Sequence, residues 1–134
     1  MKKYLFLLPL LLLLFSSCSS TESVDYEGSI IGVWLEWEEY DDENDVYINT
    51  SESKYKLEFD YMFYYFWKED ELYDELVYKV ENNNIEFYLD FDEKKESMAA
   101  KVLSVTNETL ELEWHYFPGE TYEEVIKTRY RRVK

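Results

Sequence analysis

Few side chains in this chain of 134 residues could carry out nucleophilic or acid–base chemistry. His115 is the only histidine and Cys18 the only cysteine. A serine or cysteine nucleophile needs a neighbouring base to activate it, and the sequence around His115 offers no serine. One histidine and one cysteine are also too few for the common zinc sites. We therefore expect no catalytic residue, no cofactor and no enzymatic activity.

Acidic side chains are numerous, and one stretch of them has a spacing that could suit a metal ion. Asp41, Glu43 and Asp45 alternate, and Glu52 stands twelfth when Asp41 is counted as the first position. This spacing resembles that of an EF-hand. However, Val46 stands at the sixth position, where the sharp turn requires glycine, and we expect no flanking helices. We predict no metal site and a solvated acidic loop here, with weak calcium binding as the alternative.

The N-terminus has the three parts of a secretory signal peptide. Lys2 and Lys3 form the charged start, an apolar run covers residues 4–15, and Ser16-Ser17 supply the small residues before a cut site. Such a segment is removed on export. The apolar run is too short for a transmembrane helix, which takes about 20 residues. We predict that residues 1–17 are a cleaved signal peptide, with an uncleaved anchor as the alternative.

Cys18 follows these serines directly, and the arrangement resembles a bacterial lipobox, although Phe15 stands where leucine is usual. The resemblance implies that Cys18 becomes the first residue of the mature protein and carries fatty acids such as palmitate. Two or three acyl chains hold a protein stably on a membrane. Ser19, in place of aspartate, resembles outer-membrane sorting. We predict a lipid-anchored protein of the cell envelope, with the outer membrane favoured over the inner, and a plain secreted protein as the alternative.

The charge of the remaining chain excludes several classes of partner. Without residues 1–17, 12 basic residues face 30 acidic ones over 117 residues, which gives a net charge near −18. Such a charge repels phosphate backbones and anionic lipid surfaces. We expect no nucleic-acid binding, and membrane attachment through the lipid alone. The length suits one domain, which we place at residues 28–134 behind a flexible polar linker at residues 18–27.

Apolar and polar residues alternate along much of this domain, most clearly at residues 54–60, 84–90 and 109–114. A period of two indicates antiparallel strands with one buried face. Residues 68–74 are read as a loop or a helical turn. We predict an all-β fold of about eight strands joined by hairpins, as an up-and-down barrel or curved meander. A two-sheet sandwich, with residues 41–52 as its crossover, is the alternative. The further strands expected are at residues 30–40, 61–67, 75–81, 98–106 and 122–133.

Gly32-Val33-Trp34 resembles the Gly-x-Trp motif that opens lipocalins, and the order of later segments is similar to that of small bacterial lipocalin-like domains on lipoproteins. The resemblance covers about residues 28–134. It implies a barrel that binds a small apolar or amphipathic ligand. It also implies that Trp34 packs at the closed end of the barrel under an arginine of the last strand, either Arg129 or Arg131. The segments that carry it are the strand at 54–60, Tyr78-Lys79-Val80, the Asn82–Asn84 turn, the hairpin at 100–112 and the last strand at 128–133.

Large aromatic side chains could either line or fill such a barrel. Residues 61–67 are apolar on both faces, which fits an aromatic wall or a strand buried on both sides. An eight-stranded barrel either fills with side chains or holds one small ligand. Bulky inward residues favour the filled case, and a filled barrel would be an interaction module that docks another envelope protein through its outer face. If a ligand binds, the candidate lining residues are Trp34, Phe59, Phe63, Tyr65, Phe87 and Trp114.

Overall fold

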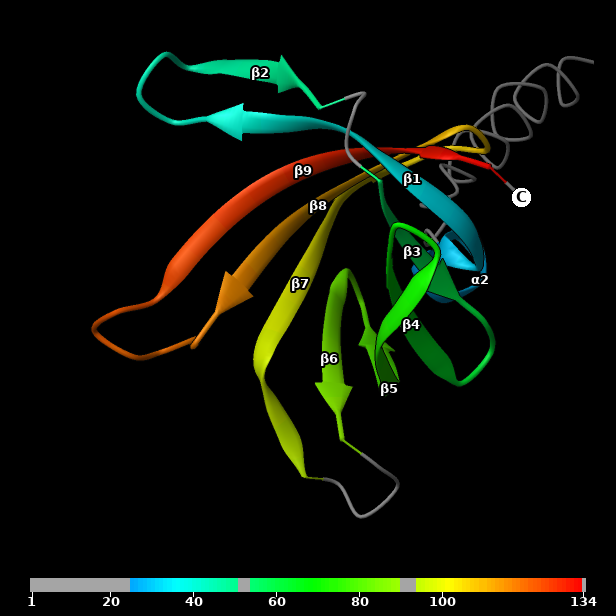
Figure 1. Cartoon of the computed structure of the whole chain (residues 1–134). Coiled ribbons are helices and arrows are strands. Elements are labelled where there is room, and N and C mark those ends of the chain that lie inside the picture. Colours follow the sequence, from blue (N-terminus) through cyan, green and yellow to red (C-terminus); the bar gives the residue numbers. More distant parts are fainter. Residues whose placement is uncertain (1–24, 51–53, 90–93, 134) are drawn as a thin grey trace, which may run out of the picture.

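The computed structural model describes residues 25–50, 54–89 and 94–133, which form a closed eight-stranded antiparallel barrel (Figure 1). Consecutive strands pair around the barrel, and pairing of the first strand with the last closes it. A further strand, β2, pairs with the outer part of β1. The elements are α2 (Tyr26–Ile30), β1 (Gly32–Asp41), β2 (Val46–Asn49), β3 (Tyr55–Phe59), β4 (Phe63–Lys68), β5 (Glu71–Glu81), β6 (Asn84–Tyr88), β7 (Lys95–Val105), β8 (Thr109–Tyr116) and β9 (Glu124–Arg132).

The all-β barrel predicted from the alternation is confirmed. In β3, Leu57 and Phe59 are buried, while Lys56 and Glu58, which alternate with them, keep partial exposure. Strands β6 and β8 follow the same rule, since a pleated strand sends successive side chains to opposite faces. The sandwich alternative is wrong, because one sheet runs from β1 through β3 to β9 and closes on β1.

The stretch predicted as an acidic loop contains a strand. Residues 42–45 form a turn, and β2 then runs antiparallel to the end of β1, with Glu39 opposite Ile48. Val46, Tyr47 and Ile48 are strand-forming side chains, and they outweigh the acidic residues on either side. The β1–β9 pairing shifts register between Glu36 and Glu38, and such bulges bend a strand. The β1–β2 hairpin thus projects from the barrel (Figure 1).

Residues 68–74, predicted as a loop or helical turn, belong to the tight hairpin between β4 and β5. Its two central residues, Glu69 and Asp70, both have positive φ, at 51° and 67°. This is the backbone of a type I′ turn, which suits the twist of paired strands and is favoured by Asn-Gly. The sequence lacks that signal, which explains why the hairpin was not predicted.

The described part of the domain begins before residue 28, the predicted boundary. Asp25 caps helix α2 by accepting a hydrogen bond of 2.9 Å from the Gly28 amide. Ile30 is fully buried and Tyr26 packs against the core, so residues 26 and 27 form part of the domain and not of a linker. The predicted signal peptide at 1–17, Cys18 and the rest of the predicted linker up to residue 24 lie outside the described residues.

Candidate functional site

Trp34 lies at the end of the barrel next to α2. The Trp34 side chain is fully buried, and its Nε1–H donates to the Ile30 carbonyl at 2.8 Å. The guanidinium of Arg132 lies 4.2 Å from the centre of the Trp34 ring. Arg132 also donates to the backbone carbonyls of Ser29, Ile31 and Asn107 at 2.7 to 3.0 Å. One side chain therefore ties α2 and the β7–β8 turn to the barrel.

The arginine over Trp34 is Arg132, and the prediction of Arg129 or Arg131 is wrong. Thr128 and Tyr130 are buried, so the even-numbered residues of β9 face the interior and carry Arg132 inward. Arg129 and Arg131 stand on the outer face. The guanidinium of Arg131 stacks at 3.5 Å on the ring of Trp37. Tyr130 is the only aromatic residue of β9 and could have indicated the inward face of this strand. Arg132, two residues later, lies on the same face.

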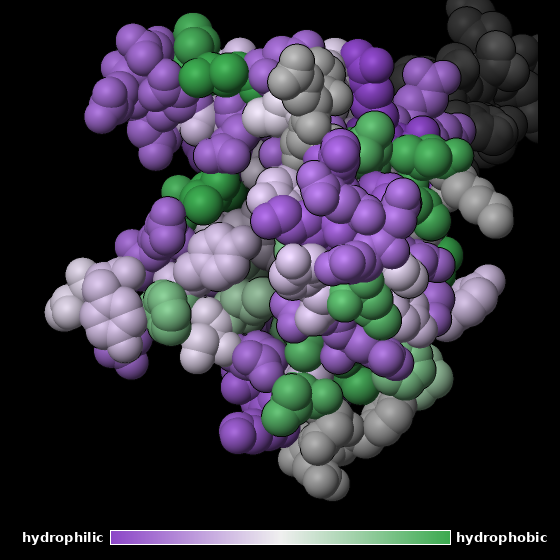
Figure 2. Space-filling model, in the orientation of Figure 1, coloured by the Kyte–Doolittle hydropathy of each residue, from purple (hydrophilic) through white to green (hydrophobic). Residues whose placement is uncertain are grey.

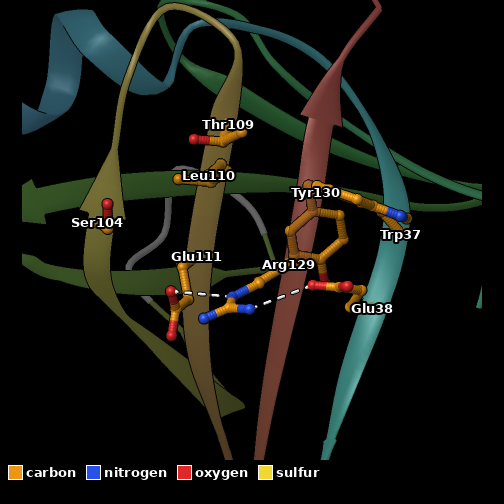
Figure 3. Close-up of a pocket in the computed structure, with 8 residues that line it drawn as sticks. All are labelled: Trp37, Glu38, Ser104, Thr109, Leu110, Glu111, Arg129 and Tyr130. Atoms are coloured by element: carbon orange, nitrogen blue, oxygen red, sulfur yellow. Dashed lines mark hydrogen bonds and ion pairs between the residues drawn. The ribbon is translucent and has the colours of Figure 1, made fainter. Parts of the chain in front are cut away.

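Arg129 forms the centre of an outer-face cluster (Figure 3). It pairs with Glu38 at 3.2 Å and Glu111 at 3.3 Å, and its guanidinium stacks at 3.5 Å on Tyr47, whose hydroxyl donates to Glu111. Burial lowers the pKa of Arg129, but the hydrogen bonds with both carboxylates outweigh it and leave the pKa raised. An adjoining surface pocket of about 340 Å³ also includes Trp37, Ser104 and Thr109.

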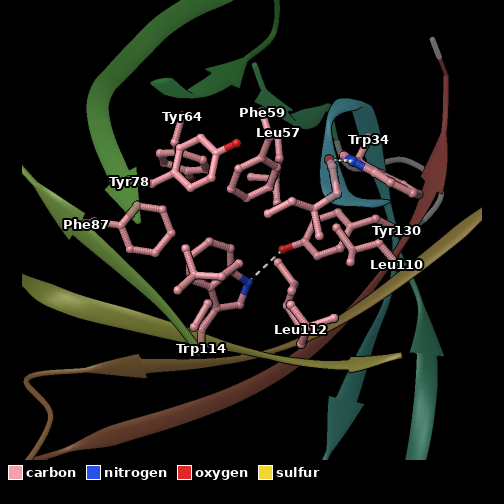
Figure 4. Close-up of a cluster of buried hydrophobic side chains, with 14 of the residues drawn as sticks. Trp34, Leu57, Phe59, Tyr64, Tyr78, Phe87, Leu110, Leu112, Trp114 and Tyr130 are labelled. Atoms are coloured by element: carbon pink, nitrogen blue, oxygen red, sulfur yellow. Dashed lines mark hydrogen bonds between the residues drawn. The ribbon is translucent and has the colours of Figure 1, made fainter. Parts of the chain in front are cut away.

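Four of the predicted lining residues fill the barrel (Figure 4). Trp34, Phe59, Phe87 and Trp114 are each at most 4 % exposed. Phe87 stacks on Trp114 with ring centres 5.7 Å apart, and Trp114 Nε1–H donates to the Tyr130 hydroxyl at 2.9 Å. These side chains contact one another and leave the interior packed, as expected for the filled case.

The other two predicted lining residues, Phe63 and Tyr65, lie on the outer face, so their assignment to the interior is wrong. Their rings contact each other with centres 6.2 Å apart, while Tyr64 between them is 3 % exposed. Residues 61–67 are apolar on both faces, so alternation alone could not choose the inward set. The Asp60 carboxylate accepts from the amides of Met62 and Phe63, and this turn sets the register that sends Tyr64 inward.

Tyr64 and Tyr130 are two of the hydroxyl-bearing residues buried in the barrel, together with Tyr78 and Thr128. Burial raises the pKa of Tyr64 and of Tyr130, so both hydroxyls stay neutral at physiological pH. The Tyr130 hydroxyl is bonded to Trp114. The Tyr64 hydroxyl has no hydrogen bond to any residue that the structure describes. Sequence reasoning missed Tyr64 because both of its neighbours are aromatic.

His115 faces outward on β8, between two carboxylates. Its Nε2 lies 2.8 Å from Glu113 and its Nδ1 lies 3.0 Å from Glu123. Burial lowers the pKa of His115, but the hydrogen bonds to Glu123 and Glu113 outweigh it and raise the pKa above 6.5. Both ring nitrogens are therefore engaged by carboxylates, and neither meets a serine hydroxyl. The arrangement joins β8 to the β8–β9 loop, which carries Glu123.

The acidic side chains at residues 41–45 serve the hairpin turn. The Asp41 carboxylate accepts from the Glu43 amide at 3.0 Å and from the Asn44 side chain at 2.6 Å, and the Tyr40 hydroxyl donates to Asp45. Glu52, the fourth residue of the calcium alternative, lies outside the described residues. Within the described ranges, no group of three or more His, Cys, Asp or Glu side chains is placed to hold a metal ion.

Beside this turn lies a surface pocket of about 460 Å³, which we call the acidic pocket. One side of it consists of acidic residues, and the other includes Ile48 and Thr50 of the β2 segment. The residues that line it are Glu39, Tyr40, Asp41, Asp42, Glu43, Ile48 and Thr50. Sequence reasoning placed the first two of these residues in a strand and the rest in a loop, and so did not bring them together.

Comparison with known proteins adds no relative. No protein-family model, no curated protein and no solved structure matches this chain. Among the helices in the described part of the chain, none has the length and apolar character needed to cross a membrane.

Proposed function

We propose that this protein is a lipid-anchored lipoprotein of the bacterial cell envelope, attached through Cys18, whose lipocalin-like barrel acts as a non-enzymatic interaction module. The N-terminal sequence supports the anchor, since a charged start, an apolar run and Ser16-Ser17 precede the sole cysteine. Its partner in this proposal is another envelope protein, bound through the outer face of the barrel.

The observation that carries the interaction role is the filled interior. Phe59, Phe87 and Trp114 occupy the space in which a barrel of this size would hold a ligand. Two surface pockets, one at Arg129 and one at the β1–β2 hairpin, open to the outside of the barrel. A protein whose core is full and whose outer face is varied in charge and shape is suited to binding other proteins.

A small apolar ligand is the second candidate, and one feature favours it. At the barrel end opposite α2, which we call the mouth, Phe66, Met98, Tyr116 and Ile126 are only partly buried against the core. The Tyr64 hydroxyl, which lacks a partner among the described residues, could donate to a bound molecule. A ligand at the mouth would rest on these side chains without entering the packed interior.

The anchor is tested by growing bacteria that produce the full chain with radiolabelled palmitate. The label should be incorporated into the wild-type protein and should be absent from Cys18→Ala. The matched control Ser20→Ala changes a neighbouring small residue and should leave labelling intact. An unlabelled wild-type chain would remove the anchor from the proposal.

The two roles of the barrel are separated by titration with an apolar fluorescent dye, 1-anilinonaphthalene-8-sulfonate. The interaction module should give no saturable increase in fluorescence. Saturable binding that is lost in Ile126→Arg, with the far-UV circular dichroism unchanged, would instead support a ligand site at the mouth.

A further inference from the structure

The outer edge of β2 is an open sheet edge. Within the described residues β2 pairs with β1 alone, whereas the barrel strands each have a neighbour on both sides. The Thr50 amide donates to the Trp37 carbonyl at 2.7 Å. Since hydrogen-bonded pairs alternate along an antiparallel ladder, Ile48 also bonds toward β1, and the backbone groups of Tyr47 point to the open edge.

This short edge strand has no charge, proline or bulge to protect it against another strand. Proteins blunt such edges with charged residues, proline or bulges, but β2 reads Val-Tyr-Ile-Asn and has no charged side chain. Val46 and Ile48 are each 50 % exposed. Figure 2 shows apolar side chains among hydrophilic ones over the projecting hairpin, at the top of the view.

The acidic pocket adjoins this edge on one face of the hairpin. Ile48 stands opposite Glu39 in the ladder, and Val46 stands opposite Asp41. The apolar residues of β2 therefore share a face with acidic side chains of β1. A strand added to β2 would place every second side chain on this face, next to the pocket.

The chemistry of the pocket selects a cationic occupant. Glu39, Asp42 and Glu43 are exposed, and none of them forms an ion pair with a lysine or arginine that the structure describes. Among the described residues, the Thr50 hydroxyl oxygen in the pocket lining has no hydrogen-bond partner. An ammonium or guanidinium group would pair with these exposed carboxylates.

We propose that β2 is the docking edge for an extended cationic segment of another polypeptide, which adds to β2 as a strand and places lysine or arginine side chains in the acidic pocket. Strand addition uses main-chain hydrogen bonds for affinity and side-chain pockets for specificity. A second copy of this chain is a poor occupant, because each copy has a formal net charge of −16. The proposal rests on the interaction role above and specifies its partner.

The test uses the wild-type chain and two labelled peptides, Lys-Val-Lys-Val-Lys-Val-Lys and the same peptide with every backbone amide nitrogen methylated. Both peptides carry the same charge, but the second cannot pair as a strand. We expect saturable binding of the first by fluorescence anisotropy, weakened at least about tenfold for the second. Amide hydrogen exchange should show new protection at Tyr47.

Matched variants separate the pocket from the overall charge. Glu39→Gln/Asp42→Asn/Glu43→Gln should weaken peptide binding by about tenfold. The control Glu81→Gln/Glu108→Gln/Glu120→Gln removes three exposed acids elsewhere and should change binding less than about twofold.

Three results would overturn the proposal: equal binding of the methylated peptide, equal weakening by both triple variants, or protection outside β2. A concentration-dependent dimer that Ile48→Lys abolishes would assign the edge to a second copy instead. These outcomes leave palmitate labelling and the dye titration unaffected, so that failure of the docking edge can be told apart from failure of the anchor or of the filled barrel.

Discussion

The indole Nε1–H of Trp114 donates a hydrogen bond of 2.9 Å to the Tyr130 hydroxyl in the core, between strands β8 and β9. Both side chains are 4 % exposed, so the bond joins two polar groups that water scarcely reaches. It permits an indole and a phenol to fill the barrel without leaving the indole donor unsatisfied. The packed interior that this bond supports is the main structural reason for favouring an outer-face function.

Tyr130→Phe should lower the free energy of unfolding by about 1–3 kcal/mol, because it leaves the Trp114 donor buried without a partner. The matched control is Tyr64→Phe, which removes a hydroxyl that bonds to no described residue and should cost less than about 0.5 kcal/mol. Urea unfolding followed by tryptophan fluorescence measures both. Equal effects of the two variants would mean that the Trp114–Tyr130 bond contributes nothing of its own.

Arg132→Ala should lower the free energy of unfolding by about 2–3 kcal/mol, because it removes the contact with Trp34 and three bonds to backbone carbonyls. Arg131→Ala removes an exposed arginine that stacks on Trp37 and should cost about 0.5–1 kcal/mol. Urea unfolding compares the two. If Arg131→Ala proved the more damaging, the closing role assigned to Arg132 would be wrong.

Replacing Glu69-Asp70 by Asn-Gly should raise the free energy of unfolding by about 1 kcal/mol, because both positions have positive φ and Asn-Gly is the preferred pair for this turn. The loss of the exposed Asp70–Lys56 pair offsets at most part of this gain. Thermal unfolding by circular dichroism measures it. The control Glu71→Gly places a glycine in the extended strand β5 and should instead lower the free energy of unfolding.

His115 should make stability fall as the solution becomes alkaline. Its pKa is raised above 6.5 in the folded protein by the Glu123 and Glu113 hydrogen bonds, which outweigh burial. A raised folded pKa means that the stabilisation is complete below about pH 6.5 and is lost as the pH rises through the folded value. The difference in unfolding free energy between wild type and His115→Gln should therefore shrink with increasing pH. A difference that is constant or grows would contradict the assignment.

Strand periodicity was enough to predict the barrel, because Leu57, Phe59 and Leu112 alternate cleanly with polar residues. It failed where both faces are apolar, as at Phe63 and Tyr65, since hydrophobicity cannot then select the inward set. It also failed at β2, where acidic neighbours concealed a short strand. Arg132 was not predicted because the alternation in β9 does not by itself show which face points inward. The burial of Tyr130 shows that the even-numbered residues do.

The acidic pocket could not be predicted from sequence order alone. Its lining joins Glu39 on β1 to Thr50 after β2, and the two come together only when the hairpin forms. The spacing of Asp41, Glu43 and Asp45 instead suggested calcium binding, as the alternative to a solvated loop. In the folded chain Asp41 accepts a hydrogen bond from the Glu43 amide within the turn, and Asp45 accepts a hydrogen bond from the Tyr40 hydroxyl.

The mass of the intact protein tests most directly whether it is a lipid-anchored barrel with a filled interior. The protein would be extracted from the membranes of the producing cells in mild detergent and measured by native mass spectrometry. We expect the mass of a chain that begins at Cys18 and carries its acyl groups, with no other molecule retained. A chain without acyl groups, or one that holds a small molecule until it is unfolded, would contradict this expectation.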